Sequence, residues 1–583
     1  MPLSEGDRIE KASGEDGGPG MRTLNRETAK AVAGADAPIH APVKVLQIGE
    51  GNFLRAFVDW MLHASRSKGL FDGAVAVVQP RPAGRAKIER LAAQDGLFTV
   101  VTRGLENGEP VERREIVSII AEAFDPYAEW ERFVALARGP ELRFIVSNTT
   151  EAGLRYEHEP LGDGPIASFP GKVARLLYER WRAFDGDPRR GLVLLPCELI
   201  ERNGDALRDA VLRHADDWGW PEAFRDWVRR HNRFLNTLVD RIVTGYPESE
   251  QAERWFAEWG YRDAMLTTAE PYHLWAIEGP PELDDELGLR KAGLNVHYTD
   301  DLAVYRERKV RILNGAHTWM APAGLLRGAR TVREALEHPA LGPAVREAVY
   351  GEIVPTMAGA EGELEAYADS VFERFANPYI RHRLADIAMN SLSKFRVRLL
   401  PSLAWYAERG LPVPPRLAEG LAGLLRYCKV RPDGSDGYVT QALDGTPIEV
   451  RDDAELLAVA AEHWRVAGGG GEGDGNGDGD ANGNVTGNGD GDGDGNGNGN
   501  GNGNGNGDGD GDVNGNGDGD VNGNGDGDVN GNVTGNGNGN GVLTAVRGLL
   551  ADERLWGRDL SGWPGLAESA AAIIENWERG VTL

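Results

Sequence analysis

Cysteine is nearly absent from this chain of 583 residues, which contains only Cys197 and Cys428. Two thiols so far apart exclude a disulfide framework, and they exclude a zinc or iron–sulfur site built from cysteines. Long apolar runs are also missing, because no stretch reaches the roughly 18 residues that a membrane-spanning helix needs. The first residues, Met1–Gly34, are polar and contain no apolar signal segment. We therefore expect a cytoplasmic protein in a reducing compartment, with no membrane partner.

Residues 468–541 lack lysine, arginine and every aromatic residue. This run consists of 33 Gly, 19 Asn, 13 Asp, five Val, two Thr, one Glu and one Ala. It offers almost no apolar surface to offset the entropy lost on ordering, so we expect a disordered insertion. Its acidic residues account for half of the formal net charge of −28, which leaves the rest of the chain only mildly acidic. No basic stripe stands out, so no nucleic-acid partner is expected.

The first large region, residues 43–300, alternates short apolar runs with helical patterns. The strand-like runs are 43–48, 74–78, 98–101, 116–120, 144–146 and 192–195. This alternation predicts an α/β fold with a Rossmann-type, doubly wound parallel sheet, although a different α/β arrangement would give a similar pattern. The preceding residues, 1–42, are polar and lack strong periodicity, and we expect them to form a largely disordered leader.

Long helical patterns dominate from residue 301 onward. They cover 309–327, 340–353, 362–376, 380–400, 415–428 and 452–466. We therefore predict an all-helical C-terminal domain over residues 301–467. Helical patterns resume after the Gly/Asn/Asp-rich run, so we expect residues 542–583 to complete the same domain and the run to lie between two surface helices.

A glycine pair follows the first predicted strand, within the segment Ile48–Arg55. Gly49 and Gly51 permit a tight turn, and the helix that begins near Asn52 and Phe53 offers free N–H groups to a pyrophosphate. The third glycine of the usual dinucleotide fingerprint is absent. An ordinary strand-to-helix turn would look similar, but the position at the first strand of an alternating domain favours a nucleotide site.

Two further polar positions follow predicted strands. Gln79 and Arg81 stand where an acidic residue would bind the ribose hydroxyls of NAD, so the residues leave NAD and NADP as alternatives. Asn148 lies in Ser147–Gly153, directly after a strand, where open α/β sheets bind ligands. The same residue types cap helices, and both roles are compatible.

Three residues near the start of the helical region could act together on a hydroxyl group. At 100° per residue, Asn314 and His317 lie one turn apart on one helix face, and Lys309 lies within about 140° of both. Oxidation of an alcohol needs a base for its proton and hydrogen-bond donors for the developing alkoxide, and it needs no metal. The alternative is that these side chains are ordinary surface residues.

Six motifs together resemble the polyol-specific long-chain dehydrogenases, also called the mannitol dehydrogenase family. They are Ile48–Phe57, Ser147–Gly153, Pro196–Gly204, Val239–Ile242, the spacing of Lys309, Asn314 and His317, and Arg374–Arg381. The resemblance implies a Rossmann-type domain followed by a helical domain. It also implies NAD-dependent, zinc-independent oxidoreductase chemistry.

The resemblance also assigns roles to single residues. Lys309 would be the general acid or base, and Asn314 and His317 would hold and polarise the substrate oxygen. Asp240 would support the proton network. Arg374 would contact the substrate. The implied coenzyme contacts are Gly49, Gly51, Asn52, Phe53, Gln79 and Asn148.

One departure from the family pattern bears on the substrate. Leu199 stands where mannitol-type members carry an asparagine that helps to bind the oxyanion. Either Asn203 or another group takes that role, or the oxyanion site rests on Asn314 and His317. This difference favours the branch of the family that acts on hexuronates over the branch that acts on simple polyols.

A hexuronate carries a carboxylate, which needs a cation. We expect at least one of Arg374, Arg381, His382 and Lys394 to bind it, and each could instead be a solvated or structural charge. Three alternatives stay open. Two belong to the same family, a fructuronate reductase (mannonate dehydrogenase) and a polyol dehydrogenase of the mannitol type. The third, from another class, is a nucleotide-binding protein that has lost catalysis. The sequence does not indicate an oligomeric state.

Overall fold

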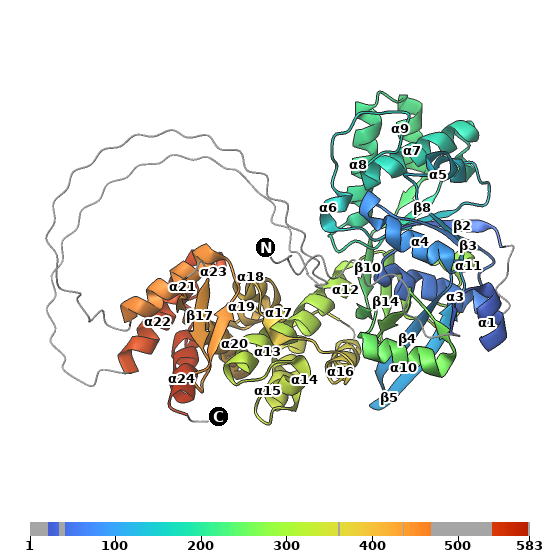
Figure 1. The fold of residues 1–583 in the computed structure, drawn as a ribbon. Helices are drawn as coiled ribbons and strands as arrows, with labels where there is room; N and C mark the ends of the chain where they lie inside the picture. Colours follow the sequence, from blue (N-terminus) through green and yellow to red (C-terminus); the bar gives the residue numbers. More distant parts are fainter. Residues whose placement is uncertain (1–20, 34–40, 360–361, 435–436, 468–538, 581–583) are drawn as a thin grey trace, which may run out of the picture. The chain divides into compact units, whose positions relative to one another are not determined.

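A computed structural model describes residues 21–33, 41–359, 362–434, 437–467 and 539–580. The chain divides into two compact units (Figure 1). The first unit runs to Arg306 and also includes Asn377–Ile380, whereas the second contains Glu307–Ala376 and most of the chain from Arg381 onward. The expected boundary was at residues 300 and 301. The expected Gly/Asn/Asp-rich insertion lies outside the described residues, apart from 539–541, which begin a helix.

The first unit is built on a six-stranded sheet in which every neighbouring pair is parallel. In spatial order its strands are β6 (Ile120–Phe124), β3 (Ala74–Val78), β2 (Val43–Ile48), β7 (Phe144–Ser147), β8 (Val193–Pro196) and β9 (Arg233–Phe234). Counted along the chain this order is 3-2-1-4-5-6, the order of a Rossmann-type doubly wound sheet. The predicted fold class is therefore confirmed.

Helices cover both faces of this sheet, and alternate strand residues divide between two apolar clusters. Val45 packs with α3 (Trp60–Ser67) and α4 (Arg85–Ala93), whereas Leu46 and Ile48 pack on the other face. Figure 1 shows the helices of that second face together. They are α5 (Trp130–Leu136), α7 (Phe169–Ala183), α8 (Asn203–Asp217) and α9 (Glu222–His231).

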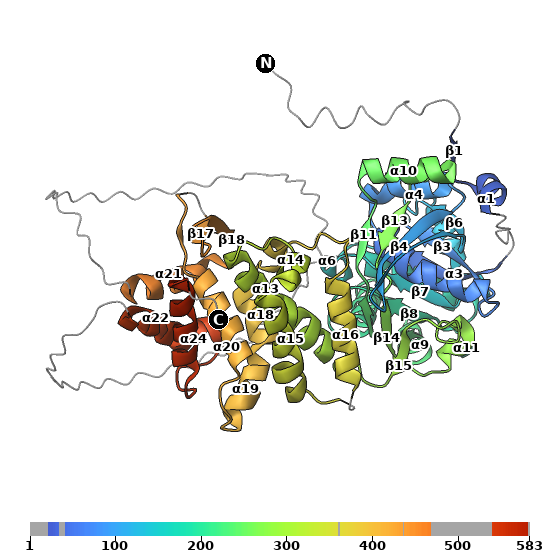
Figure 2. The same cartoon turned by 90° about the horizontal axis from the view of Figure 1, so that it is seen from below.

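Two of the predicted strands belong to a different sheet. The run at 98–101 lies in β4 (Phe98–Glu106), and the run at 116–120 is divided between the end of β5 (Glu109–Val117) and the first residue of β6. Strands β4 and β5 form an antiparallel hairpin. Asn107 and Gly108 connect them with φ values of +53° and +80°, the two-residue turn that suits twisted antiparallel strands. With β11 (Val243–Gly245) and β13 (Thr267–Ala269), the hairpin forms a four-stranded sheet, visible in Figure 2.

A three-stranded sheet completes the main framework of the first unit. It pairs β14 (Leu274–Glu278) with β10 (Thr237–Asp240) on one side and with β15 (Val296–Thr299) on the other. Further helices of the first unit are α10 (Ser249–Trp259), α11 (Leu283–Leu287) and α12 (Ala303–Arg308).

The expected disordered leader is wrong for residues 22–33. Strand β1 (Arg22–Thr23) pairs with β12 (Tyr261–Arg262), and helix α1 (Arg26–Ala33) follows it. Asn25 caps this helix, because its Oδ1 accepts a hydrogen bond from the N–H of Thr28 at 2.8 Å. Leu24 and Ala29 are buried in an apolar cluster, which explains why this short segment is ordered. Residues 1–20 and 34–40 lie outside the described part.

The second unit is mainly helical, as predicted. Its helical segments are η5 (Lys309–Asn314), α13 (Gly315–Leu326), α14 (Val332–Glu337), α15 (Leu341–Glu347), η6 (Ala348–Ile353), α16 (Glu363–Phe375), α17 (Leu384–Ile387), α18 (Ser391–Arg398), α19 (Leu400–Glu408), α20 (Pro415–Tyr427), α21 (Ala454–Ala467), α22 (Gly539–Ala551), α23 (Glu553–Trp556) and α24 (Leu566–Glu578). The prediction omitted one small antiparallel sheet, formed by β16 (Arg431–Pro432), β17 (Tyr438–Gln441) and β18 (Pro447–Val450). No helix in the described residues is long and apolar enough to cross a membrane.

The helices on either side of the Gly/Asn/Asp-rich run lie against each other. A Cβ atom on Gly541, near the start of α22, would lie 2.8 Å from the backbone oxygen of Ala467, the last residue of α21. His463 and Asp552 add an ion pair, with Nε2 and Oδ2 3.0 Å apart. The helical unit is therefore continuous in space across the run.

Candidate active site

The predicted glycine turn joins β2 to α2 (Asn52–Leu54). Gly49 has a φ of +135°, and its N–H donates to the carbonyl of Val78 at 2.9 Å. A Cβ atom on Gly49 would lie 3.1 Å from the backbone oxygen of Asn148, so only glycine fits where these strands end. A Cβ atom on Gly51, in contrast, would meet nothing within 4 Å. This open side, at a helix start without a side-chain cap, suits the phosphates of a dinucleotide.

Asn52 and Phe53, both predicted to contact the coenzyme, also stabilise the helix that follows. Oδ1 of Asn52 accepts a hydrogen bond from the guanidinium of Arg55. The ring of Phe53 stacks on Phe57, with centroids 4.9 Å apart. Arg55 is buried and donates through Nε to the carbonyl of Glu50 at 3.2 Å. These contacts fix the shape of the turn from within the protein.

Gln79 follows β3 and has a buried amide that lacks a partner. Neither its Nε2 nor its Oε1 forms a hydrogen bond with the described residues. Gly84 packs closely against it, since a Cβ atom there would lie 2.7 Å from Cβ of Gln79 and 2.9 Å from Oε1 of Glu50. A buried polar group without a partner costs about 1–3 kcal/mol, which a ribose hydroxyl would relieve. The residues of this turn therefore fit a dinucleotide. Arg81 is exposed.

The loops that follow β7 and β8 are hydrogen-bonded to each other. The side chain of Asn148 donates to the carbonyl of Cys197 at 2.7 Å, so it has a structural role besides any contact with a ligand. The buried carboxylate of Glu198 accepts from Oγ of Ser147 at 3.1 Å and from the N–H of Thr149 at 2.9 Å. Burial raises the pKa of Glu198.

Asn203 cannot supply the missing oxyanion donor. It is fully buried, and its amide donates to the carbonyls of Pro196, Glu198 and Thr237 at 3.0–3.1 Å. Its Oδ1 accepts from the N–H of Thr237 at 2.9 Å. Both ends of the amide are therefore occupied by backbone, and the alternative that rested on Asn203 is wrong. Leu199 is 42% exposed.

Asp240 ends strand β10 in the first unit and is buried. The next residue, Arg241, is buried too and donates through Nε to the carbonyl of Glu270 at 3.0 Å. Its guanidinium lies 4.2 Å from the ring centroid of Trp60. The strand end that carries Asp240 is thus held by a buried arginine. Lys309, to which the family pattern relates Asp240, belongs to the second unit.

Lys309, Asn314 and His317 lie on one continuous helix, but the predicted geometry was incomplete. Residues Lys309–Asn314 form a π-helix, and α13 continues from Gly315. A π-helix closes hydrogen bonds between residues five apart, so Lys309 and Asn314 come about one turn apart on the same face. Regular 100° spacing had separated them by about 140°. The wider turn therefore groups the three residues better than an α-helix would. Lys309 is half-buried, and Asn314 is buried.

His317 is buried among aromatic and positively charged side chains. Its ring stacks on Phe375 with centroids 4.4 Å apart, and it meets the ring of His382 edge-on at 4.9 Å. Burial lowers the pKa of His317 well below its ordinary value, and nearby positive charges lower it further. These charges belong to His382, Arg398, Arg374 and Lys394. His317 is therefore neutral near pH 7, and its Nε2 has no partner among the described residues.

Three of the four predicted carboxylate-binding residues thus surround His317. Arg374 is buried near the end of α16, and His382 follows in the next loop. Lys394 lies on α18 and donates to the carbonyl of Ile387 at 3.1 Å. Arg381 is exposed and is not among the charges that act on His317.

Arg398 belongs to the same group and was not predicted. It is buried on α18, and its Nη1 donates to Oγ1 of Thr318 at 3.2 Å. The signal was present in the sequence, because Lys394 and Arg398 are four residues apart and so share a helix face. Within the described part of the chain, no three His, Cys, Asp or Glu side chains come together as metal ligands.

Two family models match the chain. The mannitol dehydrogenase Rossmann domain matches residues 43–291, and the mannitol dehydrogenase C-terminal domain matches residues 301–456. Together they cover more than half of the sequence. The chain therefore belongs to the mannitol dehydrogenase family of oxidoreductases, which confirms the resemblance drawn from its motifs.

Individual relatives agree with this assignment. An altronate oxidoreductase of Bacillus subtilis is 47% identical over 387 residues, which are 66% of this chain and 80% of that protein. An altronate oxidoreductase of Yersinia enterocolitica is 44% identical over 71% of this chain and 84% of its own length.

Solved structures share the fold at lower identity. A D-sorbitol dehydrogenase matches with a TM-score of 0.62 and 22% identity, over 75% of this chain and 90% of that one. A Pseudomonas fluorescens mannitol 2-dehydrogenase, in a complex with NAD and D-mannitol, matches with a TM-score of 0.57 and 19% identity, over 96% and 97% of the two chains.

Proposed function

We propose that this protein is an altronate oxidoreductase, which catalyses the reversible NADH-dependent reduction of the ketone of D-tagaturonate to D-altronate. Curated relatives of that name, at 42–47% identity, support the substrate. One structural observation supports it independently. A neutral, buried His317 is surrounded by four groups that can carry positive charge, which suits an anionic substrate with a polar oxygen to be held beside the imidazole.

The coenzyme site lies at the glycine turn in this proposal. Gly51 leaves room for the pyrophosphate, and the buried amide of Gln79 binds a ribose hydroxyl. Bound NADH supplies the hydride, and NAD accepts it in the reverse direction. The turn that holds the coenzyme is shaped by Gly49, Asn52, Phe53 and Asn148.

The protein's own residues manage the proton and the substrate oxygen. Lys309 gives a proton to the oxygen as the ketone becomes an alcohol, and takes it back in the oxidation. Asn314 and His317 donate hydrogen bonds to that oxygen, where negative charge develops. A neutral imidazole can donate from one nitrogen without adding a charge. Asp240 supports the proton network, as in the family pattern.

The carboxylate of the substrate is bound by the buried cations near His317. Arg374 is the best candidate for a bidentate contact, because a guanidinium fork matches a carboxylate. Lys394 and Arg398 add positive charge beside it, whereas burial lowers the pKa of His382, which would act as a neutral hydrogen-bond partner near pH 7. Arg381, which is exposed, contributes least in this proposal.

A substrate panel tests the proposal. Purified full-length protein is assayed with NADH against D-tagaturonate and D-fructuronate, and with NAD against mannitol and arabinitol. NADPH and NADP replace the coenzyme in a parallel series. Turnover of D-tagaturonate with NADH above all other combinations is expected. Higher activity on fructuronate or on a polyol would assign the protein to another branch of the family.

Substitution of the lysine separates an enzyme from a protein that only binds nucleotides. Lys309→Ala should retain NADH binding and lose at least about a hundredfold in kcat, because general acid–base catalysis contributes about that much or more. Lys309→Arg is the matched control for charge, and it should not restore turnover. If Lys309→Ala kept full turnover, the proposed mechanism would be wrong.

A further inference from the structure

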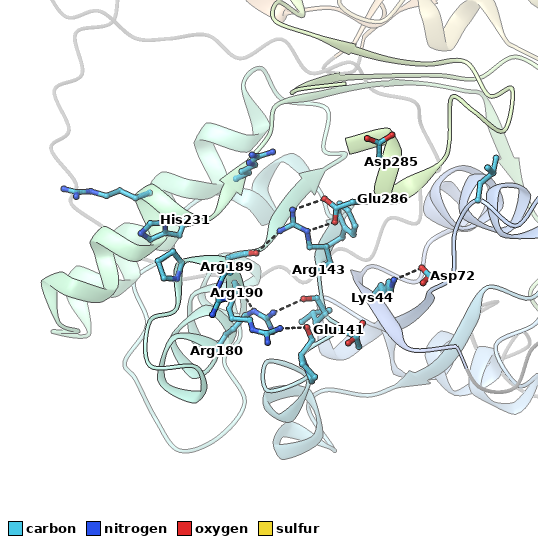
Figure 3. A pocket seen from close by; sticks show the side chains of 18 of the residues that line it. Lys44, Asp72, Glu141, Arg143, Arg180, Arg189, Arg190, His231, Asp285 and Glu286 are labelled. Carbon is cyan, nitrogen blue, oxygen red and sulfur yellow. Dashed lines mark hydrogen bonds and ion pairs between the residues drawn. The ribbon is translucent and has the colours of Figure 1, made fainter. Parts of the chain in front are cut away.

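A large open cavity lies at the edge of the first unit opposite the coenzyme turn. Its volume is about 990 Å³, and its walls include Lys44, Arg143 and Arg233 (Figure 3). These residues lie at or beside the amino-terminal ends of β2, β7 and β9, whereas Gly49 follows the carboxyl-terminal end of β2. The five steps of extended strand from Lys44 to Gly49 span about 17 Å. The cavity is therefore separate from the coenzyme site.

Positive charge predominates in the walls of this cavity. Seven lysine and arginine side chains line it, against four carboxylates. This excess is notable in a chain whose formal net charge is −28. Few large apolar side chains contribute, so the cavity does not suit a ligand with a bulky apolar part such as a nucleobase.

Some of these cations are already used within the protein. Lys44 forms an ion pair with Asp72 at 2.6 Å. Arg143 forms a bidentate ion pair with the carboxylate of Glu286, with hydrogen bonds of 2.6 and 2.9 Å. Arg180 is buried, and its guanidinium donates to four backbone carbonyls, including those at the end of helix α5. Arginines that satisfy a helix C-terminus need no ligand, so Arg180 has a structural explanation.

Arg190 and Arg233 lack a carboxylate partner among the described residues. Arg190 donates to the carbonyl of Pro140 at 3.1 Å, and its guanidinium lies 5.0 Å from the ring centroid of Phe184. The side chain of Arg233 is exposed and forms no hydrogen bond or ion pair in the part of the chain that the structure describes. Burial is the main cause that lowers the pKa of Arg180, and the neighbouring charges of Arg190 and Arg143 lower it further. Figure 3 shows all three in the same wall of the cavity.

We propose that this cavity is a second ligand site, which binds a compact polyanion through Arg190 and Arg233. Phosphate chemistry fits best, as a phosphate monoester or an inorganic pyrophosphate, because the guanidinium fork binds phosphate oxygens in pairs. A doubly charged anion also relieves the repulsion among Arg143, Arg180 and Arg190. The four carboxylates limit the cavity to small anions and disfavour extended ones such as nucleic acid.

Calorimetric titration of the full-length protein tests this site. The protein is first saturated with NADH, so that the coenzyme site cannot bind the probe. Inorganic pyrophosphate is then titrated, with glycerol 3-phosphate in a second series to represent monoesters. Binding with a Kd of about 1 mM or tighter to at least one probe is expected, at one site per chain. Sodium chloride at matched ionic strength controls for general charge effects.

Variants of Arg190 and Arg233 test whether the probe binds in this cavity. Arg190→Gln combined with Arg233→Gln should weaken the probe at least about tenfold, because two charge-assisted contacts are lost. Arg254→Gln is the matched control, since Arg254 is an exposed arginine on α10 of the same unit, and it should bind the probe like the unchanged protein. Arg233→Gln alone removes no internal contact, so it tests the site even if Arg190→Gln unfolds the protein.

Several results would overturn the proposal. They are no binding of either probe to the NADH-saturated protein, and equal affinity in the unchanged protein and in Arg233→Gln. None of these outcomes bears on the substrate panel, so the two proposals fail or succeed separately.

Discussion

The imidazole of His317 lies against the phenyl ring of Phe375, with ring centroids 4.4 Å and ring planes 29° apart. His382 meets the same imidazole edge-on, with the planes 80° apart. These two contacts hold the imidazole in one orientation. Because its Nε2 has no partner among the described residues, this nitrogen is available to a ligand.

Loss of this imidazole should affect turnover more than binding. His317→Asn is expected to lower kcat about a hundredfold to a thousandfold with little change in KM, because a donor to a developing oxyanion acts mainly in the transition state. His338→Asn is the control, as His338 lies in the same unit and its Nδ1 accepts from backbone N–H groups of its own loop. A large rise in KM at constant kcat would assign His317 to ground-state binding.

Substitutions of the two glycines in the coenzyme turn should have different effects, one on fold stability and the other on NADH binding. Gly49→Ala is expected to destabilise the fold by about 1–3 kcal/mol, since φ is +135° and the new Cβ would crowd Asn148. Gly51→Ala should leave the melting temperature unchanged and weaken NADH binding at least about tenfold, because the methyl group enters space that the protein leaves open. Thermal melts and NADH titration separate the two effects. A Gly51→Ala variant with unchanged NADH affinity would place the pyrophosphate elsewhere.

One half-buried histidine should make stability depend on pH. Nε2 of His273 accepts the N–H of Asn295 at 3.1 Å, and burial is the main cause that lowers its pKa to about 4. The unfolded chain binds a proton near the ordinary pKa of about 6.5, so stability is full above that value and falls as pH drops toward 4. The contribution is about 1–2 kcal/mol between pH 7 and pH 5.

His273→Gln tests this expectation. The variant should lose part of the difference in unfolding free energy between pH 7 and pH 5 that the unchanged protein shows in urea titrations. His158→Gln serves as the control, because the side chain of His158 is 76% exposed. An identical pH dependence in all three proteins would show that His273 is protonated equally in the folded and unfolded states.

The Gly/Asn/Asp-rich run should be dispensable for catalysis. The proposed catalytic residues all precede residue 400, and α21 and α22 lie against each other at the ends of the run. Replacement of residues 470–540 with a short Gly-Ser linker is expected to leave kcat/KM within about twofold, because only the first two residues of α22 are removed and α21 stays intact. More than a tenfold loss in a variant that melts like the full chain would show that the run takes part in activity.

Local sequence patterns predicted the framework of the site. Features that depend on residues close together in the chain could be predicted, and these are the strand at 43–48, the glycine turn and the family motifs. The hairpin turn at Asn107 and Gly108 was not recognised in the sequence, and the strands on either side of it were assigned to the parallel sheet because strand partners are not local. The π-helix at Lys309 could not be predicted from periodicity, since it changes the periodicity itself.

Contacts between residues that are far apart in the chain could not be predicted from the sequence. Asn203 was a plausible oxyanion donor until its amide was found bonded to the backbone around Thr237. Arg398 was overlooked because its position beside His317 depends on how α18 packs on α13. Burial, too, emerged only from the structure. Burial leaves the side-chain amide of Gln79 without a hydrogen-bond partner among the described residues, and it keeps His317 neutral.

The most direct test of the account compares two ketoses that differ only in the carboxylate. The ratio of kcat/KM for D-tagaturonate over D-tagatose, measured with NADH, reports what the buried cations around His317 recognise. We expect a ratio of at least about 10³, falling at least about tenfold in Arg374→Gln, because a site built for a polar group strongly rejects an analogue that lacks it. A ratio near one, or a large ratio unchanged in Arg374→Gln, would contradict the account.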